Sequence, residues 1–336
     1  MKEEIKLEPI LIVKDLKTYF YMEEGVVKAV DGVSFELFPN EVLGIVGETG
    51  SGKSVTVKSI MRLIKPPGKI VGGEVIYNGT DILKLPEREM YKIRGKEISM
   101  IFQDPMSSLN PLYTIGDQLM ETIIQHTGVD KRKAYMRAVE MLERVGIPEA
   151  EKRMNSYPFE FSGGMRQRVV IAIALSCNPK ILIADEPTTA LDVTIQAQIL
   201  ELMKELQKEF KMGLIFITHD LGVIAEMANR IMVMYGGKQM EMGSADDIFY
   251  RPRHPYTKML LRSIPRVDKK LDRLEPIPGQ PPRMVNIPPV CPFLPRCPRR
   301  VSKCREKLPD MVEIEPGHFV RCFNPVEIEE SEEVIS

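Results

Sequence analysis

Hydrophobic and polar residues alternate in two stretches near the start of the chain. ILIVKDL and VVKAVDGVSFEL, between Leu11 and Leu37, show the two-residue period that is typical of antiparallel strands. An unbroken apolar run from Val42 to Val46 then leads through a glycine-rich turn into a helical pattern that starts at Lys53. This order predicts the strand-loop-helix unit of an α/β domain.

Helical periodicity dominates the middle of the chain. From about Pro105 to Ser176 it recurs in segments such as IGDQLMETIIQHT and KRKAYMRAVEMLERVG, which predicts an inserted helical subdomain at about 105–176. Two runs typical of buried strands, KILIADEP and GLIFITHD, then flank the helical pattern TIQAQILELMKELQKEF. We therefore expect an α/β core over residues 1–250.

The composition changes after Tyr250. More than half of the 26 prolines lie between Arg251 and Pro325, and proline disfavours long regular elements. We expect an irregular C-terminal extension over residues 251–325 and an acidic tail over residues 326–336.

Charge and hydrophobicity exclude several classes of protein. The 46 basic and 47 acidic residues give a net charge of −1, which argues against a nucleic-acid partner. The hydrophobic fraction of 43% is sufficient for a packed core. Apolar runs fall short of the roughly 18 to 20 residues that span a bilayer, and the N-terminus lacks the pattern of a secretion signal. We therefore expect a cytoplasmic protein.

A phosphate-binding motif follows the run from Val42 to Val46. The residues Gly47, Glu48, Thr49, Gly50, Ser51, Gly52, Lys53 and Ser54 fit G-x-x-x-x-G-K-[ST] in the required strand-to-helix context. The glycines allow backbone N–H groups to surround phosphates, Lys53 can reach the β and γ oxygens, and the Ser54 hydroxyl can bind Mg²⁺.

Two carboxylates end the next predicted buried strand. Asp185 suits the Mg²⁺ shell, and Glu186 suits the polarisation of an attacking water. A third piece is the segment FSGGMRQ, in which Ser162, Gly163 and Gly164 precede an apolar helix and offer N–H groups to an anion.

With these motifs in this order, the chain resembles the ATP-binding cassette (ABC) ATPases over roughly residues 10–250. The resemblance implies a head-to-tail dimer in which Ser162 and Gly164 of one subunit close on ATP held by the other. It also implies that Gln103 is the Q-loop glutamine near Mg²⁺ and the catalytic centre, Ala190-Leu191-Asp192 the D-loop and His219 the switch histidine. Phe20 matches the aromatic residue that stacks on adenine, with Tyr19 and Tyr21 as alternatives. The chain has no N-K-x-D motif for guanine, so ATP is favoured over GTP.

The extension resembles that of oligopeptide and dipeptide importer ATPases. The similar segments are HPYT from His254, PIPGQPP, and CPFLPRCPRRVSKC, together with MIFQDPMSSLNPL and FSGGMRQR in the core. The resemblance implies a subunit that hydrolyses ATP on the cytoplasmic face of the membrane. Its partners would be two permease subunits, a second ABC ATPase in a heterodimer or otherwise a homodimer, and indirectly an extracellular substrate-binding protein. We interpret His254 as a helix cap rather than a catalytic base.

Four of the five cysteines lie in the extension. Cys291, Cys297, Cys304 and Cys322 are separated by five, six and seventeen residues, unlike the C-x-x-C knuckles of zinc ribbons. Four thiolates suit either Zn²⁺ or a [4Fe-4S] cluster, and the resemblance implies the cluster. We expect the metal centre to fold the extension at a distance from the ATP chemistry.

Two other functions fit parts of the sequence. Importers of this kind can carry oligosaccharides, and the residues that select the cargo belong to partner subunits. Soluble ABC proteins of translation or DNA repair are a second alternative, but they carry two cassettes or long coiled coils. This chain has one cassette and no heptad run.

Overall fold

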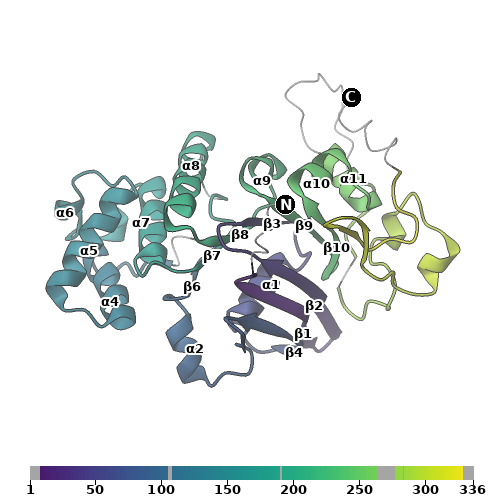
Figure 1. Cartoon of the computed structure of the whole chain (residues 1–336), viewed down its shortest axis with the longest axis horizontal. Coiled ribbons are helices and arrows are strands. Elements are labelled where there is room, and N and C mark those ends of the chain that lie inside the picture. Colours follow the sequence, from purple (N-terminus) through teal and green to yellow (C-terminus); the bar gives the residue numbers. More distant parts are fainter. Residues whose placement is uncertain (1–7, 105–107, 190, 264–276, 283, 328–336) are drawn as a thin grey trace, which may run out of the picture. The chain divides into compact units, whose positions relative to one another are not determined.

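The computed structural model describes residues 8–104, 108–189, 191–263, 277–282 and 284–327. These residues form two compact units, each assembled from several segments of the sequence. The first unit comprises Leu37–Val42 and Lys84–Ile217 with the described residues before Leu11, and the second comprises Leu11–Glu36, Leu43–Leu83 and the described residues from Thr218 onward. Figure 1 labels most of their helices and strands.

Three parallel strands organise the first unit. They are β6 (Ile98–Ile101), β7 (Ile181–Asp185) and β8 (Gly213–Ile217), in the order β6-β7-β8. Every residue of β7 and β8 is buried, as expected for parallel strands that are covered on both faces. Both apolar runs that the sequence predicts as buried strands are thus confirmed.

Helices make up most of the predicted helical subdomain. They are α4 (Ile115–Thr127), α5 (Lys131–Arg144), α6 (Ala150–Arg153), the 3-10 turn η1 (Pro158–Glu160) and α7 (Gly163–Leu175), and the first unit also contains α2 (Glu87–Ile93) and α8 (Val193–Phe210). Thr114 caps α4 by accepting the N–H of Asp117. In Figure 1 these helices are drawn in blue to teal. Residues 105–107 of the predicted subdomain lie outside the described part.

An antiparallel sheet in the second unit confirms the strands predicted near the N-terminus. Its order is β2-β1-β4-β5, with bounds Gly25–Leu37 for β2, Leu11–Met22 for β1, Gly68–Tyr77 for β4 and Thr80–Asp81 for β5. Strands β1 and β4 pair with Leu11 opposite Tyr77 and Phe20 opposite Gly68.

The second unit also holds the strand that carries the phosphate-binding motif. The order there is β3 (Val42–Val46), β9 (Arg230–Tyr235), β10 (Lys238–Ser244), β12 (His318–Val320) and β11 (Val312–Glu315). Strand β3 runs parallel to β9, and β12 pairs with β10 through Glu241 and Val320. The extension therefore adds strands to a sheet that begins in the core.

The remaining elements of the second unit are short. Helices α1 (Lys53–Ile60), α9 (Leu221–Met227) and α10 (Ala245–Tyr250) precede the extension, which contains α11 (Pro255–Arg262) and the 3-10 turns η2 (Leu294–Arg296) and η3 (Ser302–Arg305). Described elements of the extension have eight residues or fewer, as its proline content predicts.

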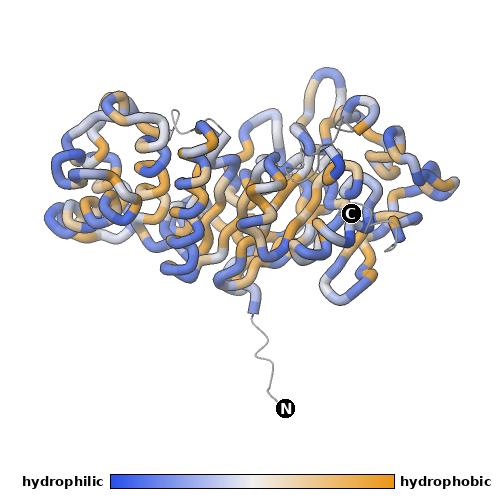
Figure 2. The backbone as a smooth tube through the Cα atoms, turned by 90° about the horizontal axis from the view of Figure 1, so that it is seen from above, coloured by the Kyte–Doolittle hydropathy of each residue, from blue (hydrophilic) through white to orange (hydrophobic). Residues whose placement is uncertain are grey.

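Aromatic packing joins the extension to the sheet. The rings of Tyr235 in β9, Tyr256 in α11 and Phe293 lie with centroids 4.5 to 5.3 Å apart, and all three side chains are buried. Figure 2 shows hydrophobic residues in orange mainly in the interior of the tube, whereas many of the loops at its edge are blue. In the part of the chain that the structure describes, no helix has both the length and the apolar character needed to cross a membrane.

Candidate nucleotide and cysteine sites

The predicted phosphate-binding loop connects β3 to α1 and has two positions where only glycine fits. A Cβ on Gly47, whose φ is 148°, would lie 2.1 Å from the Met234 carbonyl oxygen. A Cβ on Gly52, whose φ is 104°, would lie 2.2 Å from the Ala29 carbonyl oxygen. Gly50 differs, because a Cβ there would find nothing within 4 Å. The loop is thus packed at both ends and open in the middle.

Lys53 supplies the positive charge of this loop. It is 5% exposed, and its Nζ donates to the carbonyl oxygens of Gly47 at 2.7 Å and Glu48 at 3.1 Å. Gly52 provides no side-chain cap for α1, and the buried Ser51 Oγ has no hydrogen-bond partner among the described residues. A cation, an uncapped helix N-terminus and an orphan hydroxyl together fit a polyphosphate.

The aromatic residues at the end of β1 have different surroundings. The Tyr19 hydroxyl donates to Asp31 at 2.7 Å, so Tyr19 belongs to a polar network on one face of the strand. Phe20 lies on the other face together with Thr18, whose hydroxyl is 2.7 Å from that of Ser59 in α1. Phe20 therefore lies on the face of β1 that is turned toward α1, the helix that begins at the phosphate-binding loop. Its stacking on adenine stays a prediction.

The carboxylates predicted to act in hydrolysis end strand β7 in the first unit. Asp185 is 1% exposed, whereas Glu186 has a left-handed backbone with φ of 50° and donates its N–H to the Ile217 carbonyl at 2.9 Å. Gln103 Nε2 donates to Glu186 Oε2 at 3.0 Å, and the Thr189 hydroxyl donates to the same oxygen at 3.0 Å. The structure therefore brings Gln103 to Glu186 as a pair and adds Thr189, which the sequence analysis missed.

Ser162 and Asp192 each begin a helix of the first unit. Ser162 caps α7 by accepting the Met165 N–H at 3.3 Å, and Asp192 caps α8 by accepting the Ile195 N–H at 3.0 Å. A Cβ on Gly164 would lie 2.6 Å from the Ile195 side chain, which explains the glycine at that position. Gly163 is the first residue of α7, and Ala190 of the predicted D-loop lies outside the described residues. The roles of these residues toward nucleotide stay predictions.

His219 lies in the second unit between a buried residue and a capped helix. Thr218 before it is 4% exposed, and Asp220 after it caps α9 by accepting the N–H groups of Gly222 and Val223. The backbone on both sides is therefore fixed, while His219 itself is exposed. This arrangement suits a residue that contacts a ligand, and its role as the switch histidine stays a prediction.

The four cysteines of the extension influence one another electrostatically. Burial raises the pKa of Cys322 to about 12, with further contributions from the thiols of Cys291, Cys297 and Cys304. Burial likewise raises the pKa of Cys291 to about 11. These contributions indicate that the four thiols lie in the same part of the extension, although no three of their sulfur atoms lie within 4.8 Å of one another. The chemistry of this donor set fits a metal group that takes four thiolates.

The extension contacts the phosphate-binding loop, which the sequence analysis did not predict. The expectation that the metal centre itself lies at a distance from the ATP chemistry stays a prediction. Arg296, immediately before Cys297, forms an ion pair with Glu48 at 2.6 Å. The Tyr256 hydroxyl accepts the backbone N–H of Glu48 at 2.9 Å. The sequence analysis missed both residues because a solvated arginine and a structural HPYT turn are the commoner interpretations of such segments.

His254 in the HPYT segment is a helix cap, as predicted. Its Nδ1 accepts the Tyr256 N–H at 3.0 Å at the start of α11, and the residue is 1% exposed. Burial lowers the pKa of His254 to about 3, so the imidazole is neutral at physiological pH.

A second polar cluster joins α10 to β11 and β12. Ligand atoms of Asp247, Glu315 and His318 lie within 4.8 Å of one another, and His318 is fully buried. Arg251 pairs with both carboxylates, and Arg253 pairs with Glu315 at 3.1 Å. With its acids already neutralised by arginine, this cluster is better suited to holding the extension together than to binding a cation.

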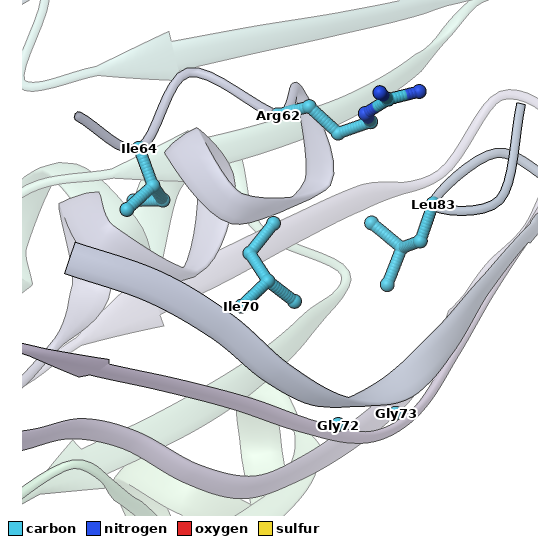
Figure 3. Close-up of a pocket in the computed structure, with 6 residues that line it drawn as sticks. All are labelled: Arg62, Ile64, Ile70, Gly72, Gly73 and Leu83. Atoms are coloured by element: carbon cyan, nitrogen blue, oxygen red, sulfur yellow. The ribbon is translucent and has the colours of Figure 1, made fainter. Parts of the chain in front are cut away.

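Figure 3 shows a pocket of the second unit that lies beyond the C-terminal end of α1. Ile70 and Leu83 face each other across it, and Arg62 lies at its rim. Because the phosphate-binding loop precedes the other end of α1, this pocket is distinct from the phosphate site.

The chain is similar to known proteins over nearly its whole length. Residues 30–189 match the family model "ABC transporter", and residues 240–304 match "Oligopeptide/dipeptide transporter, C-terminal region". The oligopeptide transport ATP-binding protein OppD of Escherichia coli (strain K12) is 51% identical over 320 residues, which cover 95% of this chain and 94% of that protein. The dipeptide transport ATP-binding protein DppD of Bacillus subtilis (strain 168) is 51% identical over 318 residues, covering 94% and 95%.

Solved structures show the same fold. The dimeric post-hydrolysis structure of the ATP-binding cassette MJ0796 bound to ADP and Pi has a TM-score of 0.62 and 31% identity, covering 70% of this chain and 98% of that one. The cbiO1 structure from Clostridium perfringens has a TM-score of 0.62 and 26% identity, covering 73% and 92%. Fold and motifs together define an ATP-hydrolysing cassette. The chain belongs to the ABC transporter family, in the branch that carries the oligopeptide/dipeptide transporter C-terminal region.

Proposed function

We propose that this chain is the ATP-binding and ATP-hydrolysing subunit that energises an ABC importer of oligopeptides or dipeptides. The observation that carries the proposal is the 51% identity to OppD and DppD over nearly the whole length of both chains, extension included. The chain would work at the cytoplasmic face of the membrane as a peripheral subunit. Uptake of oligosaccharides by the same motor is the alternative outcome of the test below.

The site residues have separate tasks in this proposal. The phosphate-binding loop holds the triphosphate, with Lys53 as its cation and Ser54, Gln103 and Asp185 as the residues that would hold Mg²⁺. A Mg²⁺ ion held by these residues would supply positive charge next to the phosphates. Glu186 polarises the attacking water, and the hydrogen bond from Gln103 together with that from Thr189 keeps its carboxylate in one orientation.

We propose that the active form is a dimer with permease subunits as partners. In this form Ser162 and Gly164 of one subunit contact the ATP bound by the other, and the N-terminus of α7 faces the γ-phosphate. The capped start of α7 and the close approach of Gly164 to Ile195 support this role, because they fix the backbone N–H groups in a usable orientation. The opposite subunit would be a second, related ABC ATPase or another copy of this chain.

We also propose that Cys291, Cys297, Cys304 and Cys322 hold a [4Fe-4S] cluster. A tetrahedral zinc ion with bonds of about 2.3 Å would bring its sulfur ligands to about 3.8 Å from one another. Among the described residues, Asp247, Glu315 and His318 form the one set of three or more ligand atoms that lie within 4.8 Å of one another. No three of the thiols form such a set, so the thiols are spaced more widely than zinc requires. A cluster with four separate iron atoms suits that wider spacing.

Reconstitution tests the transport role. The chain would be co-expressed with the permeases and ATPase encoded beside it, and proteoliposomes would be assayed for ATP-driven uptake of labelled tripeptides and of labelled oligosaccharides. Peptide uptake that disappears in the Glu186→Gln variant supports the proposal. Uptake of oligosaccharides but not of peptides would show that the importer carries oligosaccharides. ATP hydrolysis that is not stimulated by the permeases would contradict a transport role.

A further inference from the structure

Two residues of the C-terminal extension hold Glu48, the second residue of the phosphate-binding loop. The carboxylate forms a bidentate pair with Arg296, in which Nη1 lies 2.6 Å from Oε2 and Nη2 lies 3.1 Å from Oε1. The backbone N–H of Glu48 donates to the Tyr256 hydroxyl oxygen at 2.9 Å. Side chain and main chain of this loop residue are therefore both fixed by residues beyond position 250.

The guanidinium of Arg296 has a hydrogen bond for each of its N–H groups. Besides the two bonds to Glu48, Nη1 donates to the Tyr235 hydroxyl at 3.0 Å, Nη2 donates to the Ile277 carbonyl at 3.1 Å and Nε donates to the Pro278 carbonyl at 2.9 Å. The side chain is 5% exposed. Because all five N–H donors of Arg296 have an acceptor, its side chain is held in a single conformation. The Glu48 carboxylate, which accepts two of these bonds, is therefore also held in place.

The segment that presents Arg296 is anchored independently of this ion pair. The Phe293 ring lies 5.3 Å from the rings of both Tyr235 and Tyr256. The Pro292 side chain approaches Gly236 so closely that a Cβ on that glycine would be 2.6 Å away. Arg296 is therefore a rigid part of the cysteine-bearing segment.

Electrostatics give the contact a consequence for nucleotide binding. The Glu48 carboxylate belongs to a loop suited to a polyphosphate, and an unpaired negative charge there would repel the ligand. We propose that Arg296 is a positioning residue for this loop. By neutralising and orienting Glu48, while Tyr256 holds its backbone, Arg296 sets the affinity of the loop for ATP. This inference rests on the nucleotide-binding role proposed for the loop and adds that the extension controls its affinity.

The test compares Arg296→Met with Arg305→Met, a matched change at an exposed arginine of the same extension. In Arg296→Met, the Kd and KM for ATP should rise about tenfold, the change produced by losing a contact of about 1.4 kcal/mol. The kcat value should stay within about twofold, because the loop holds the phosphates equally in ground and transition states. Arg305→Met should match the wild type. A folding defect would instead lower kcat at unchanged KM, which would overturn the proposal.

A double-mutant cycle with Glu48→Gln isolates the ion pair. In the Glu48→Gln background there is no charge to neutralise, so Arg296→Met should raise the Kd for ATP by less than about twofold. Equal losses in both backgrounds would show that Arg296 acts independently of Glu48 and would overturn the proposal, as would unchanged affinity in the single variant. If the wild-type chain itself did not bind ATP, the assignment of the loop would be wrong. That failure can be distinguished from a failure of the Arg296 proposal, because it is seen in the wild type before any residue is changed.

Discussion

The side-chain amide of Gln103 donates a 3.0 Å hydrogen bond to the carboxylate of Glu186 in the first unit. The two residues are 83 positions apart in sequence, and the Thr189 hydroxyl donates to the same carboxylate oxygen. Two donors to one oxygen hold this carboxylate in one orientation. In the proposed mechanism this carboxylate polarises the attacking water, which makes Glu186 the most informative residue to change.

Glu186→Gln should bind ATP like the wild type but hydrolyse it at least about a hundredfold more slowly, because the change removes the charge that polarises water and keeps the shape. Phosphate release and the binding of a fluorescent ATP analogue measure the two effects separately. Thr189→Val is the matched control, since it removes a donor to the carboxylate but leaves the charge, and it should lose much less turnover. Unaltered turnover in Glu186→Gln would contradict the assignment.

Lys53→Ala should lose nucleotide binding rather than turnover alone. The Lys53 ammonium lies among the carbonyl oxygens of its own loop, and the variant would leave the phosphates without their cation. Equilibrium binding of ATP measured by calorimetry checks the outcome. Lys58→Ala, a change at a lysine in the last turn of the same helix, controls for nonspecific effects of charge and helix stability. Tight ATP binding by Lys53→Ala would refute the role of the loop.

The local elements could be predicted from sequence because their patterns are short-range. The glycine-rich turn between Val46 and Lys53 and the buried strand before Asp185 follow from hydrophobic periodicity and from backbone conformations that glycine alone adopts readily. Periodicity also predicts the stripe of Ile115, Leu119 and Ile123 that α4 buries. These features depend on residues that are close together in sequence.

The contacts between distant segments could not be predicted in this way. Glu48 and Arg296 are 248 positions apart, and the pairing of β10 with β12 joins Glu241 to Val320. Nothing in the local pattern of PRC distinguishes an arginine that meets the phosphate-binding loop from one that meets water. For this reason the contact between the extension and the phosphate-binding loop was not predicted, although the irregular structure of the extension was predicted correctly.

Acid should destabilise the chain in part through His254. Burial lowers its pKa in the folded state to about 3, whereas the unfolded value is near 6.5, so the stability that the neutral ring contributes is complete above pH 6.5 and is lost progressively as the pH falls toward 3. At pH 5 the loss relative to neutral pH should be about 2 kcal/mol, since each pH unit is worth about 1.4 kcal/mol.

The comparison of wild type with His254→Asn isolates this titration. Asparagine can cap α11 through its side-chain oxygen but does not titrate, so the variant should show a smaller fall in unfolding free energy between pH 7 and pH 5. Urea unfolding at both pH values measures the difference. Equal falls for the two proteins would show that His254 is not protonated during acid destabilisation.

Dimer formation should depend on ATP and should be weak without nucleotide, because the proposed contact between subunits runs through the phosphates and the start of α7. Sedimentation of Glu186→Gln with and without ATP is the direct measurement, since the variant retains the ligand. Ser162→Arg should prevent association while leaving the Kd for ATP of the monomer unchanged, because in the proposed dimer Ser162 contacts the ATP that is bound by the opposite subunit. A monomer in both conditions would argue against the composite site.

The final prediction concerns the metal proposed to be held by the four cysteines of the extension. Protein purified without oxygen should be brown and contain about four irons per chain, whereas a zinc site would be colourless and contain one metal ion. Cys297→Ser should lose the metal. It should also raise the KM for ATP, because Cys297 directly follows Arg296, whose ion pair fixes Glu48.

Cys177→Ser is the control for that experiment, since Cys177 lies outside the extension, directly after the residue that caps the end of α7. The Cys177→Ser variant should retain its iron and the wild-type KM for ATP. If Cys297→Ser lost its iron but kept the wild-type KM for ATP, the metal would have no influence on the phosphate-binding loop. Its role would then be to stabilise the extension alone. Colourless protein with one zinc per chain would overturn the iron assignment but keep the four-thiolate site. Metal-free protein with full ATP affinity would overturn both, because the aromatic contacts of Phe293 would then suffice to hold Arg296 against Glu48.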